Sequence, residues 1–447
     1  MNGVYPGARH DGFSFSSPRD AAGGIAMATI QTIDSNFTSP IQVIGTDDIL
    51  TINRGVQGVL DVLAIDAATL ADNRQFDIRG RVTANSGADC LHLGLESDPS
   101  GSSGGSINLR GSGRLTSDTG TVIAAYIQDI EIIINGNIKG RNGIIGDLFG
   151  GSLVNKGDII AVEQAFFSVS GSFDLTNRGL MKSTDDTTIT LTGSGNSLFN
   201  YGDIRGLGAG PTVFFDSASG NFNTCRNNGG IFSGDIAIQC GVGNDLIFND
   251  GFVKGDIILG DGFNQFSCRI GKVDGFVYGG MDSDTYNLFG SKVKVVELDG
   301  GGIDSFNRTA STRLPEFVEN LFLLGKGDIN GTGNAEDNGL FGNRGNNVLR
   351  GLDGMDLISA GRGNDKCFGG MGPDTFMIYS DSGKDRVMDF SWQDDILDVA
   401  SFGYDTFSEV MDHVIAIKGG VVFTDGGARI ELPDVKLNLL GEDNFNY

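Results

Sequence analysis

Residues 342–377 read GNRGNNVLR GLDGMDLIS AGRGNDKCF GGMGPDTFM, four contiguous nine-residue segments that follow the pattern Gly-Gly-x-Gly-x-Asp-x-apolar-x. Glycine and Asx residues favour tight turns, so the first six residues of each segment predict a turn. The last three predict a short strand whose eighth side chain points inward. Two segments would then form one coil of a parallel β-roll. The eighth positions are Leu349, Ile358, Cys367 and Phe376.

The sixth positions predict a calcium site. Stacked coils at about 4.8 Å would place one carboxylate above another, and carboxylates that lie close together away from water repel strongly. Ca²⁺ removes this repulsion and accepts about 6–8 oxygen ligands, including backbone carbonyls that glycine turns expose. The alternative is a glycine-rich coil with hydrated Asp corners. The predicted ligands are Asn347, Asp356, Asp365 and Asp374, together with Gly345, Gly354, Gly363 and Gly372.

A second repeat precedes these segments, with a period of about 20 residues, which is typical of a parallel β-solenoid. It is Asn-x-Gly followed by an apolar residue, and short Val, Ile or Phe runs accompany it. An asparagine at one fixed corner could hydrogen-bond to the asparagine of the next coil. The alternative is a β-sandwich with glycine-rich turns. The phrase starts at Asn155, Asn177, Asn200, Asn228 and Asn249.

A third phrase, Gly-x-Gly-x-Asp/Asn-x-apolar, occurs once per coil between about residues 240 and 310. Its sixth positions are either further calcium ligands or plain Asx-turn corners. They are Asp245, Asn264, Asp284 and Asp304.

Composition excludes several classes of protein. With 57 acidic and 32 basic residues the net charge is −25, which argues against nucleic-acid binding. No apolar run is long enough for a transmembrane helix. We find no Sec-type signal, and Met27 is an alternative start to Met1. The five cysteines lack zinc-type or disulfide-type spacing.

The nine-residue segments resemble the RTX (hemolysin-type calcium-binding) repeat family. The resemblance extends to the lead-in at 318–334, to Gly383–Phe390 and to the C-terminal end at Leu439–Tyr447. It implies type I export of an unfolded chain, which folds when it meets Ca²⁺ outside the cell. The expected location is therefore extracellular or at a bacterial cell surface.

The resulting expectation is an all-β chain in which a parallel β-solenoid (β-helix) runs into a calcium-binding parallel β-roll with a C-terminal β-rich cap. We expect a polar tail at 1–30, the solenoid at 31–330 and the β-roll at 331–380. The cap and secretion signal are expected at 381–447. Phe390, Trp392, Phe402 and Phe407 are the aromatic residues expected in the cap.

Two classes of function remain open. The favoured one is a non-enzymatic structural, surface-layer, matrix or adhesion protein, which could self-associate into a layer or filament or bind cell-surface polysaccharide. The alternative is a polysaccharide lyase or epimerase on a β-helix, which rests on fold analogy alone. His10, His92 and His413 lie in no catalytic motif, and the adjacent carboxylates Asp185 and Asp186 would point to opposite faces of a strand.

Overall fold

The computed structural model describes residues 13–16, 30–39, 41–42, 49–60, 65–67, 73–94, 103–218 and 220–447. It is nearly all β, with 49 % of residues in strands and 4 % in helices, arranged as about 15 turns of a parallel β-solenoid. The chain forms two compact units. The first comprises 1–258 and 273–275, and the second comprises 259–272 and 276–447.

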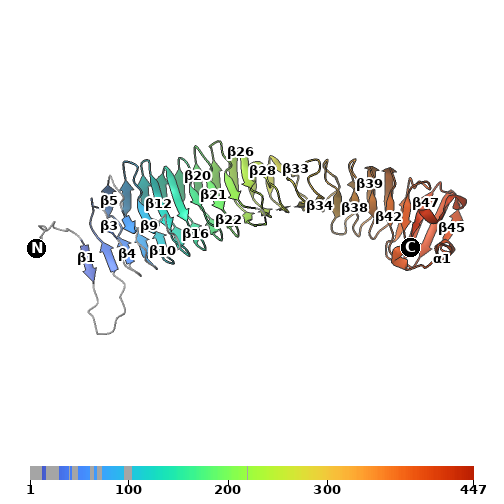
Figure 1. Cartoon of the computed structure of the whole chain (residues 1–447), viewed down its shortest axis with the longest axis horizontal. Coiled ribbons are helices and arrows are strands. Elements are labelled where there is room, and N and C mark those ends of the chain that lie inside the picture. The colour runs from blue at the N-terminus through green and yellow to red at the C-terminus, as the bar shows by residue number, and fades with distance from the viewer. Residues whose placement is uncertain are drawn as a thin grey trace, which may run out of the picture. The chain divides into compact units, whose positions relative to one another are not determined.

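Coils of the first unit contain three strands each. In one coil, β13 (Glu131–Ile134), β14 (Asn137–Gly140) and β15 (Asn142–Asp147) follow one another. Each pairs in parallel with its counterpart in the next coil (Figure 1). In this register, Glu131 lies beside Ser152 and Ile144 beside Phe166. Alternate side chains point inward, and Ile132 and Ile138 are fully buried. Burial of one apolar row per strand is what drives each coil onto its neighbour.

The strands of the first unit fall into three stacked rows. The first row contains β2 (Ile30–Ile33), β4 (Ile49–Ile52), β7 (Gln75–Ile78), β10 (Ser106–Leu109), β13, β16 (Ser152–Asn155), β19 (Asp174–Asn177), β22 (Ser197–Asn200), β25 (Thr224–Asn227) and β27 (Leu246–Asn249). The second contains β5 (Gln57–Leu60), β8 (Arg81–Ala84), β11 (Arg114–Ser117), β14, β17 (Asp158–Ala161), β20 (Leu180–Ser183), β23 (Asp203–Gly206), β26 (Gly230–Cys240) and β28 (Phe252–Ile258). The third contains β3 (Ile41–Gln42), β6 (Ile65–Ala67), β9 (Leu91–Gly94), β12 (Thr121–Tyr126), β15, β18 (Phe166–Ser168), β21 (Ile189–Thr192), β24 (Val213–Asp216) and the end of β26. Residues 273–274 of β30 (Lys272–Asp274) also belong to this unit.

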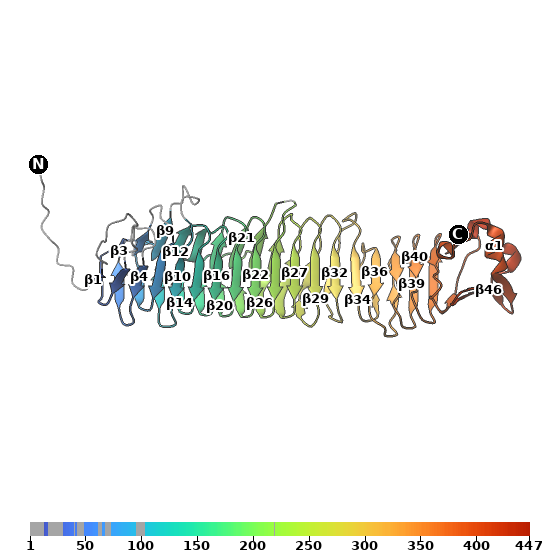
Figure 2. The same cartoon turned by 90° about the horizontal axis from the view of Figure 1, so that it is seen from below.

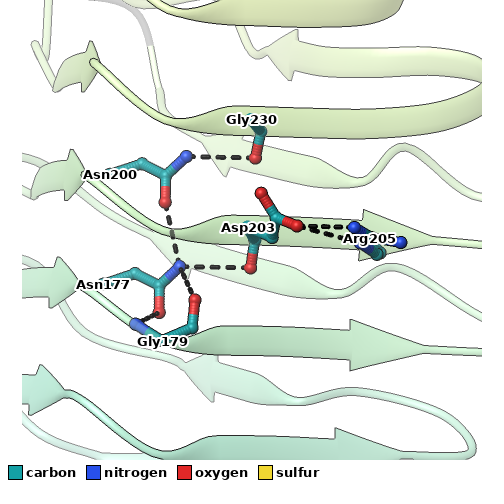
Figure 3. A network of polar contacts seen from close by, with 6 residues as sticks. All are labelled: Asn177, Gly179, Asn200, Asp203, Arg205 and Gly230. Carbon is teal, nitrogen blue, oxygen red and sulfur yellow. Dashed lines mark hydrogen bonds and ion pairs between the residues drawn. The ribbon is translucent and has the colours of Figure 1, made fainter.

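A ladder of buried asparagines runs along one corner of the first unit, as the Asn-x-Gly repeat predicts. Each side-chain amide donates to the next side-chain oxygen, at 2.8 Å from Asn155 to Asn177 and 2.9 Å from Asn177 to Asn200. The Asn177 amide also donates to the carbonyls of Gly179 and Asp203 (Figure 3). The ladder continues at 2.8 Å to Asn227 and 2.9 Å to Asn249.

One assignment in this repeat is wrong by one residue. The sequence phrase assigns Asn228 to the ladder, but Asn228 is exposed and Asn227 is the ladder member. The glycine two positions after each ladder asparagine explains why Asn227, and not Asn228, belongs to the ladder. An added Cβ at Gly229 would lie 2.1 Å from the carbonyl oxygen of Gly202, so only glycine allows the coils to stack there.

Coils of the second unit become shorter and contain two strands. One row contains β29 (Gln265–Cys268), β32 (Thr285–Leu288), β34 (Ser305–Arg308), β36 (Asn320–Leu323), β38 (Gly339–Phe341), β40 (Leu357–Ser359), β42 (Thr375–Met377), β44 (Ile396–Asp398) and β48 (Phe445–Asn446). The facing strands are β31 (Phe276–Tyr278), β33 (Lys294–Val296), β35 (Thr312–Arg313), β37 (Gly331–Thr332), β39 (Val348–Asp353), β41 (Lys366–Met371) and β43 (Lys384–Val387). Gly339 pairs with Leu357 and Leu357 with Thr375, so two nine-residue segments make one coil, as expected.

The chain end of the second unit is an antiparallel meander. It consists of β45 (Val414–Ile417), β46 (Gly420–Asp425) and β47 (Ala428–Pro433), and β47 pairs in parallel with β43. The helix α1 (Phe407–Asp412) precedes it (Figure 2). Short 3-10 helices lie at Ala400–Phe402, Leu437–Leu439 and Glu442–Asn444.

The aromatic residues expected in the cap divide into two groups. Phe390 packs near Phe376, Phe402 contacts Phe423, and Phe407 lies near Phe445. Trp392 is 43 % exposed and therefore contributes less to this packing than expected.

The expected all-β solenoid fold is confirmed. Cys367 lies in the core, and all five cysteines are buried. Among the described residues of the stretch expected to be a polar tail, Phe13–Ser16 form β1, which pairs antiparallel with β2. The remainder of that stretch up to residue 29, including Met27 and His10, lies outside the described residues. No helix in the described parts of the chain has the length and apolar character needed to cross a bilayer.

Candidate calcium site

The sixth-position residues of the nine-residue segments form two rows, one at each corner of the β-roll. In one row the N–H of Asp356 donates to Asp374 Oδ1 at 3.0 Å. In the other, the N–H of Asn347 donates to Asp365 Oδ1 at 2.6 Å. The structure therefore stacks Asp356 on Asp374 and Asn347 on Asp365, as the 18-residue coil requires.

Each buried aspartate uses one oxygen for this backbone contact and leaves the other without a donor. In the described residues, the Oδ2 atoms of Asp356, Asp365, Asp374 and Asp385 are buried and have no hydrogen-bond partner. These side chains are at most 2 % exposed. A buried carboxylate oxygen without a partner is costly unless a proton or a cation meets it.

Burial also disfavours the charged form of these groups. Desolvation raises the pKa of Asp356 to about 6 and that of Asp374 to about 7, and neighbouring carboxylates add to the shift. The pKa values of Asp365 and Asp385 are raised for the same reason. A row of carboxylates, each with one buried oxygen that no donor meets, is a donor set that suits a hard divalent cation.

The fourth-position glycines line the same corners. Gly354 and Gly372 lie one above the other with φ of +119° and +124°, and a Cβ on Gly372 would lie 2.1 Å from the Gly354 carbonyl oxygen. Gly363 is stacked on Gly345 in the same manner, with 2.5 Å between its added Cβ and the Gly345 oxygen. Only glycine fits these positions, which precede the sixth-position residues by two in each segment.

Asn347 differs from the three aspartates. Its side-chain oxygen accepts the N–H of Asn343 at 2.9 Å, and its amide nitrogen donates to Asn343 Oδ1 at 3.1 Å and to the carbonyl of Ile329. The polar atoms of its side chain thus hydrogen-bond to protein groups, whereas each of the three aspartates has an oxygen that is available to a cation.

Both rows continue beyond the nine-residue segments, which the sequence pattern missed. The N–H of Asp365 donates to Asp385 Oδ1 at 2.9 Å, and the N–H of Asp374 donates to Asp395 Oδ1 at 3.0 Å. On the other side, the N–H of Asn338 donates to Asp356 at 2.9 Å. The signal in the sequence is a step of 20 or 21 residues from Asp365 and Asp374, in place of 18.

The four earlier positions occupy the equivalent corner of their coils, but their surroundings differ. Both oxygens of Asp245 accept hydrogen bonds, from the N–H of Asn223 at 2.7 Å and from Ser217 Oγ at 3.2 Å. The Asn264 amide donates to carbonyls of its own turn, including that of Gly262 at 3.0 Å. Both residues have the contacts of an Asx corner.

Asp284 and Asp304 belong to a cluster of buried acidic groups. The N–H of Asp284 donates to Asp304 Oδ1 at 2.7 Å. Glu297 lies beside them, so that oxygens of the three carboxylates are within 4.8 Å of one another. No sequence phrase includes Glu297.

The possible catalytic groups stay dispersed. Asp185 and Asp186 are exposed in the turn between β20 and β21. His92 Nδ1 lies 3.5 Å from Asp89, and His413 Nδ1 lies 3.9 Å from Asp425 in the second unit.

Comparison with known proteins finds a calcium-binding repeat within the chain. Residues 341–376 match the model of the RTX calcium-binding nonapeptide repeat in four copies. The chain is 31 % identical over 163 residues to the endo-1,3-1,4-beta-glycanase EglC of Rhizobium meliloti (strain 1021), a match that covers 36 % of this chain and 32 % of that protein. The chain thus spans about a third of that relative's length. A solved structure, the extracellular lipase LipA from Serratia marcescens, is similar with a TM-score of 0.21 and 14 % identity, over 52 % of this chain and 41 % of that one.

The fold and the two carboxylate rows define a parallel β-solenoid with repeats of a calcium-binding type. Within this solenoid, residues 341–376 carry four copies of the RTX calcium-binding nonapeptide repeat.

Proposed function

We propose that this chain is an extracellular structural or adhesive β-solenoid whose nonapeptide region folds when Ca²⁺ binds. The observation that carries the proposal is the pair of rows in which buried aspartates each hold one oxygen without a hydrogen-bond donor. RTX repeats are typical of type I-secreted extracellular bacterial proteins, which supports the proposed location.

The chain's own residues account for the dependence on calcium. Stacking of coils brings Asp356 above Asp374 and Asp365 above Asp385, and at neutral pH the separation of charge from water opposes this stacking. Ca²⁺ supplies positive charge and oxygen coordination at the rows. The glycine columns at Gly354 and Gly363 let the coils approach closely enough for one ion to reach both. Where free Ca²⁺ is scarce, the same repulsion keeps the segment open and suited to export.

Hydrogen exchange of the full chain, in chelator and in millimolar Ca²⁺, tests this proposal. Peptides from 339–398 should gain protection with Ca²⁺ and not with Mg²⁺, while peptides of the asparagine ladder at 152–249 should stay protected in both. Far-UV circular dichroism should show a gain of β-structure over the same titration. Equal protection of 339–398 with and without Ca²⁺ would refute the proposal.

Self-association is part of the structural role that we propose. Solenoid ends expose strand edges that either carry a cap or stack on a partner. The meander β45–β47 extends the sheet at β43 in the second unit. Light scattering in millimolar Ca²⁺ should show assemblies larger than one chain, and a strict monomer would contradict this part of the proposal.

Binding or cleavage of polysaccharide is the second candidate function. The similarity to a glycanase favours this second candidate, although the similar region covers a third of that protein. In the first unit, a groove of about 240 Å³ is lined by Arg54, Arg79, Arg81 and Arg114. Four arginines on one face of a chain with a net charge of −25 suit an anionic sugar polymer.

Affinity electrophoresis in gels that contain polygalacturonate separates binding from turnover. The parent chain should be retarded and Arg81→Gln/Arg114→Gln should not, whereas Arg362→Gln, which changes an exposed arginine of the second unit, should behave as the parent. Release of unsaturated sugar ends would assign an enzyme. Equal mobility in gels with and without the polymer would exclude this groove as the binding surface.

A further inference from the structure

A second acidic cluster lies in the second unit outside the nonapeptide rows. Asp284 precedes β32, Asp304 precedes β34 on the next coil, and Glu297 follows β33 on the facing sheet. Asp284 and Asp304 are 1 % exposed and Glu297 is 5 % exposed. Their carboxylate oxygens lie within 4.8 Å of one another.

Two oxygens of this cluster have no partner. Asp304 Oδ1 accepts from the N–H of Asp284, but Asp304 Oδ2 is buried without a hydrogen bond in the described residues. Glu297 Oε1 contacts the hydroxyl of Tyr286, while Glu297 Oε2 is likewise without a partner. The Tyr286 hydroxyl also lies 3.4 Å from Asp284 Oδ2.

The glutamate departs from the apolar pattern of its row. Successive backbone bonds, from the N–H of Leu259 to Tyr278 and from the N–H of Gly279 to Val296, place Leu259, Gly279 and Glu297 at the same step of successive coils. A Cβ on Gly279 would lie 2.2 Å from Glu297 Oε1, so the glycine leaves the space that the carboxylate fills. A buried leucine on one coil is therefore replaced by a buried acid two coils later.

In the part of the chain that the structure describes, no basic side chain forms an ion pair with these three carboxylates. Desolvation raises the pKa of Asp284 and Glu297 to about 8 and that of Asp304 to about 7. The charges that raise the pKa of Glu297 further are Asp304 and Asp284, and the N–H of Asp304 is itself bonded to Glu319 Oε2 at 2.7 Å. Three such groups need either shared protons or a cation.

We propose that Asp284, Glu297 and Asp304 bind a Ca²⁺ ion inside the coil, at a site separate from the nonapeptide rows. Each of the three carboxylates places one oxygen within 4.8 Å of the others, and Asp304 Oδ2 and Glu297 Oε2 have no protein donor. Carboxylate oxygens are the ligands that Ca²⁺ takes in proteins. The ion joins both sheets of a coil and two successive corners. The stability of coils that precede residue 339 thereby also depends on calcium. The assignment adds to the calcium-binding function proposed above, but it rests on a different set of residues.

Calcium stoichiometry of the full chain tests the site. After equilibrium dialysis at pH 7.5, Glu297→Gln should hold about one Ca²⁺ fewer per chain than the parent. Asp299→Asn, which changes an exposed acid two residues away, should hold the parent number. Asp365→Asn should lose ions from the nonapeptide rows without affecting this one. An unchanged stoichiometry in Glu297→Gln would mean that the cluster holds protons, even if the nonapeptide rows bind calcium.

A luminescence readout covers the case in which Glu297→Gln does not fold. Tb³⁺ at the site would be excited through Tyr286, whose hydroxyl contacts two of the carboxylates. Tyr286→Phe retains all three carboxylates and should lose part of the tyrosine-sensitised Tb³⁺ emission. Tyr201→Phe, an exposed tyrosine of the first unit, should lose none. Equal emission from the parent and Tyr286→Phe would overturn the proposal.

Discussion

Two adjacent asparagines provide a controlled test of the ladder. Asn227 is 1 % exposed and Asn228 is exposed, although both belong to the same Asn-Asn-Gly-Gly sequence. We expect Asn227→Ala to destabilise the chain strongly and Asn228→Ala to have little effect. The two variants have identical composition, so a difference between them reports position alone.

The contacts of Asn227 set the magnitude. Its oxygen accepts from Asn200 at 2.8 Å, and its amide donates to Asn249 Oδ1 at 2.9 Å and to the carbonyl of Phe252 at 3.3 Å. Three hydrogen bonds at about 1 kcal/mol each give a loss of about 3 kcal/mol. A surface substitution such as Asn228→Ala usually stays within about 0.5 kcal/mol.

Urea unfolding in saturating Ca²⁺, followed by far-UV circular dichroism, measures both variants against the parent. The comparison requires equal m values, because a solenoid can unfold in parts. Hydrogen exchange at 224–252 should locate the loss in the coils around Asn227. Equal free energies of unfolding for the two variants would refute the ladder as a source of stability.

Three further predictions follow from the carboxylate rows. Asp374→Asn should weaken calcium binding on the order of tenfold in a Ca²⁺ titration, while Asp394→Asn, an exposed neighbour of the row, should not; equal midpoints would contradict the assignment. In chelator, folded Asp356 and Asp374 keep protons up to pH values of about 6 and 7, whereas the unfolded chain releases them near about pH 4. The free energy of unfolding should therefore fall as pH rises from 4 to 7 in chelator and rise over the same range in Ca²⁺, since protons compete with the ion; parallel pH profiles would exclude this linkage. Finally, Cys367 should react with an alkylating reagent after chelation while Cys225 stays protected, which peptide mass spectrometry can measure; simultaneous labelling would mean that the two units open together.

Most of the fold could be predicted from the repeat phrases, because they encode both the turns and the close approach of neighbouring coils. Glycine columns and inward apolar residues leave a periodic trace, so coil length and the stacking of Asp356 on Asp374 were predictable. The choice of Asn227 as the ladder residue was not predictable, because two asparagines precede two glycines there. In the structure, the approach of Gly229 to the Gly202 carbonyl oxygen, together with the burial of Asn227, distinguishes the two asparagines.

Other parts of the site leave no periodic trace. Asp385 and Asp395 join the rows after steps of 20 and 21 residues, outside any nine-residue frame. Glu297 is an inward residue of the facing sheet, which carries no repeat phrase, and the coil closure alone brings it to Asp284. The helix α1 has six residues, too few for a helical period to appear in the sequence.

The half-coil length of the nonapeptides constrains how this region can change in size. Leu349 stacks on Cys367 in one sheet, while Ile358 stacks on Phe376 in the other. Deletion of 18 residues would shorten the β-roll by one coil and return every later strand to its own sheet. Deletion of nine would exchange the sheets for everything downstream and bring the meander β45–β47 to the opposite face. Insertions and deletions that preserve this architecture should therefore come in steps of two nonapeptides.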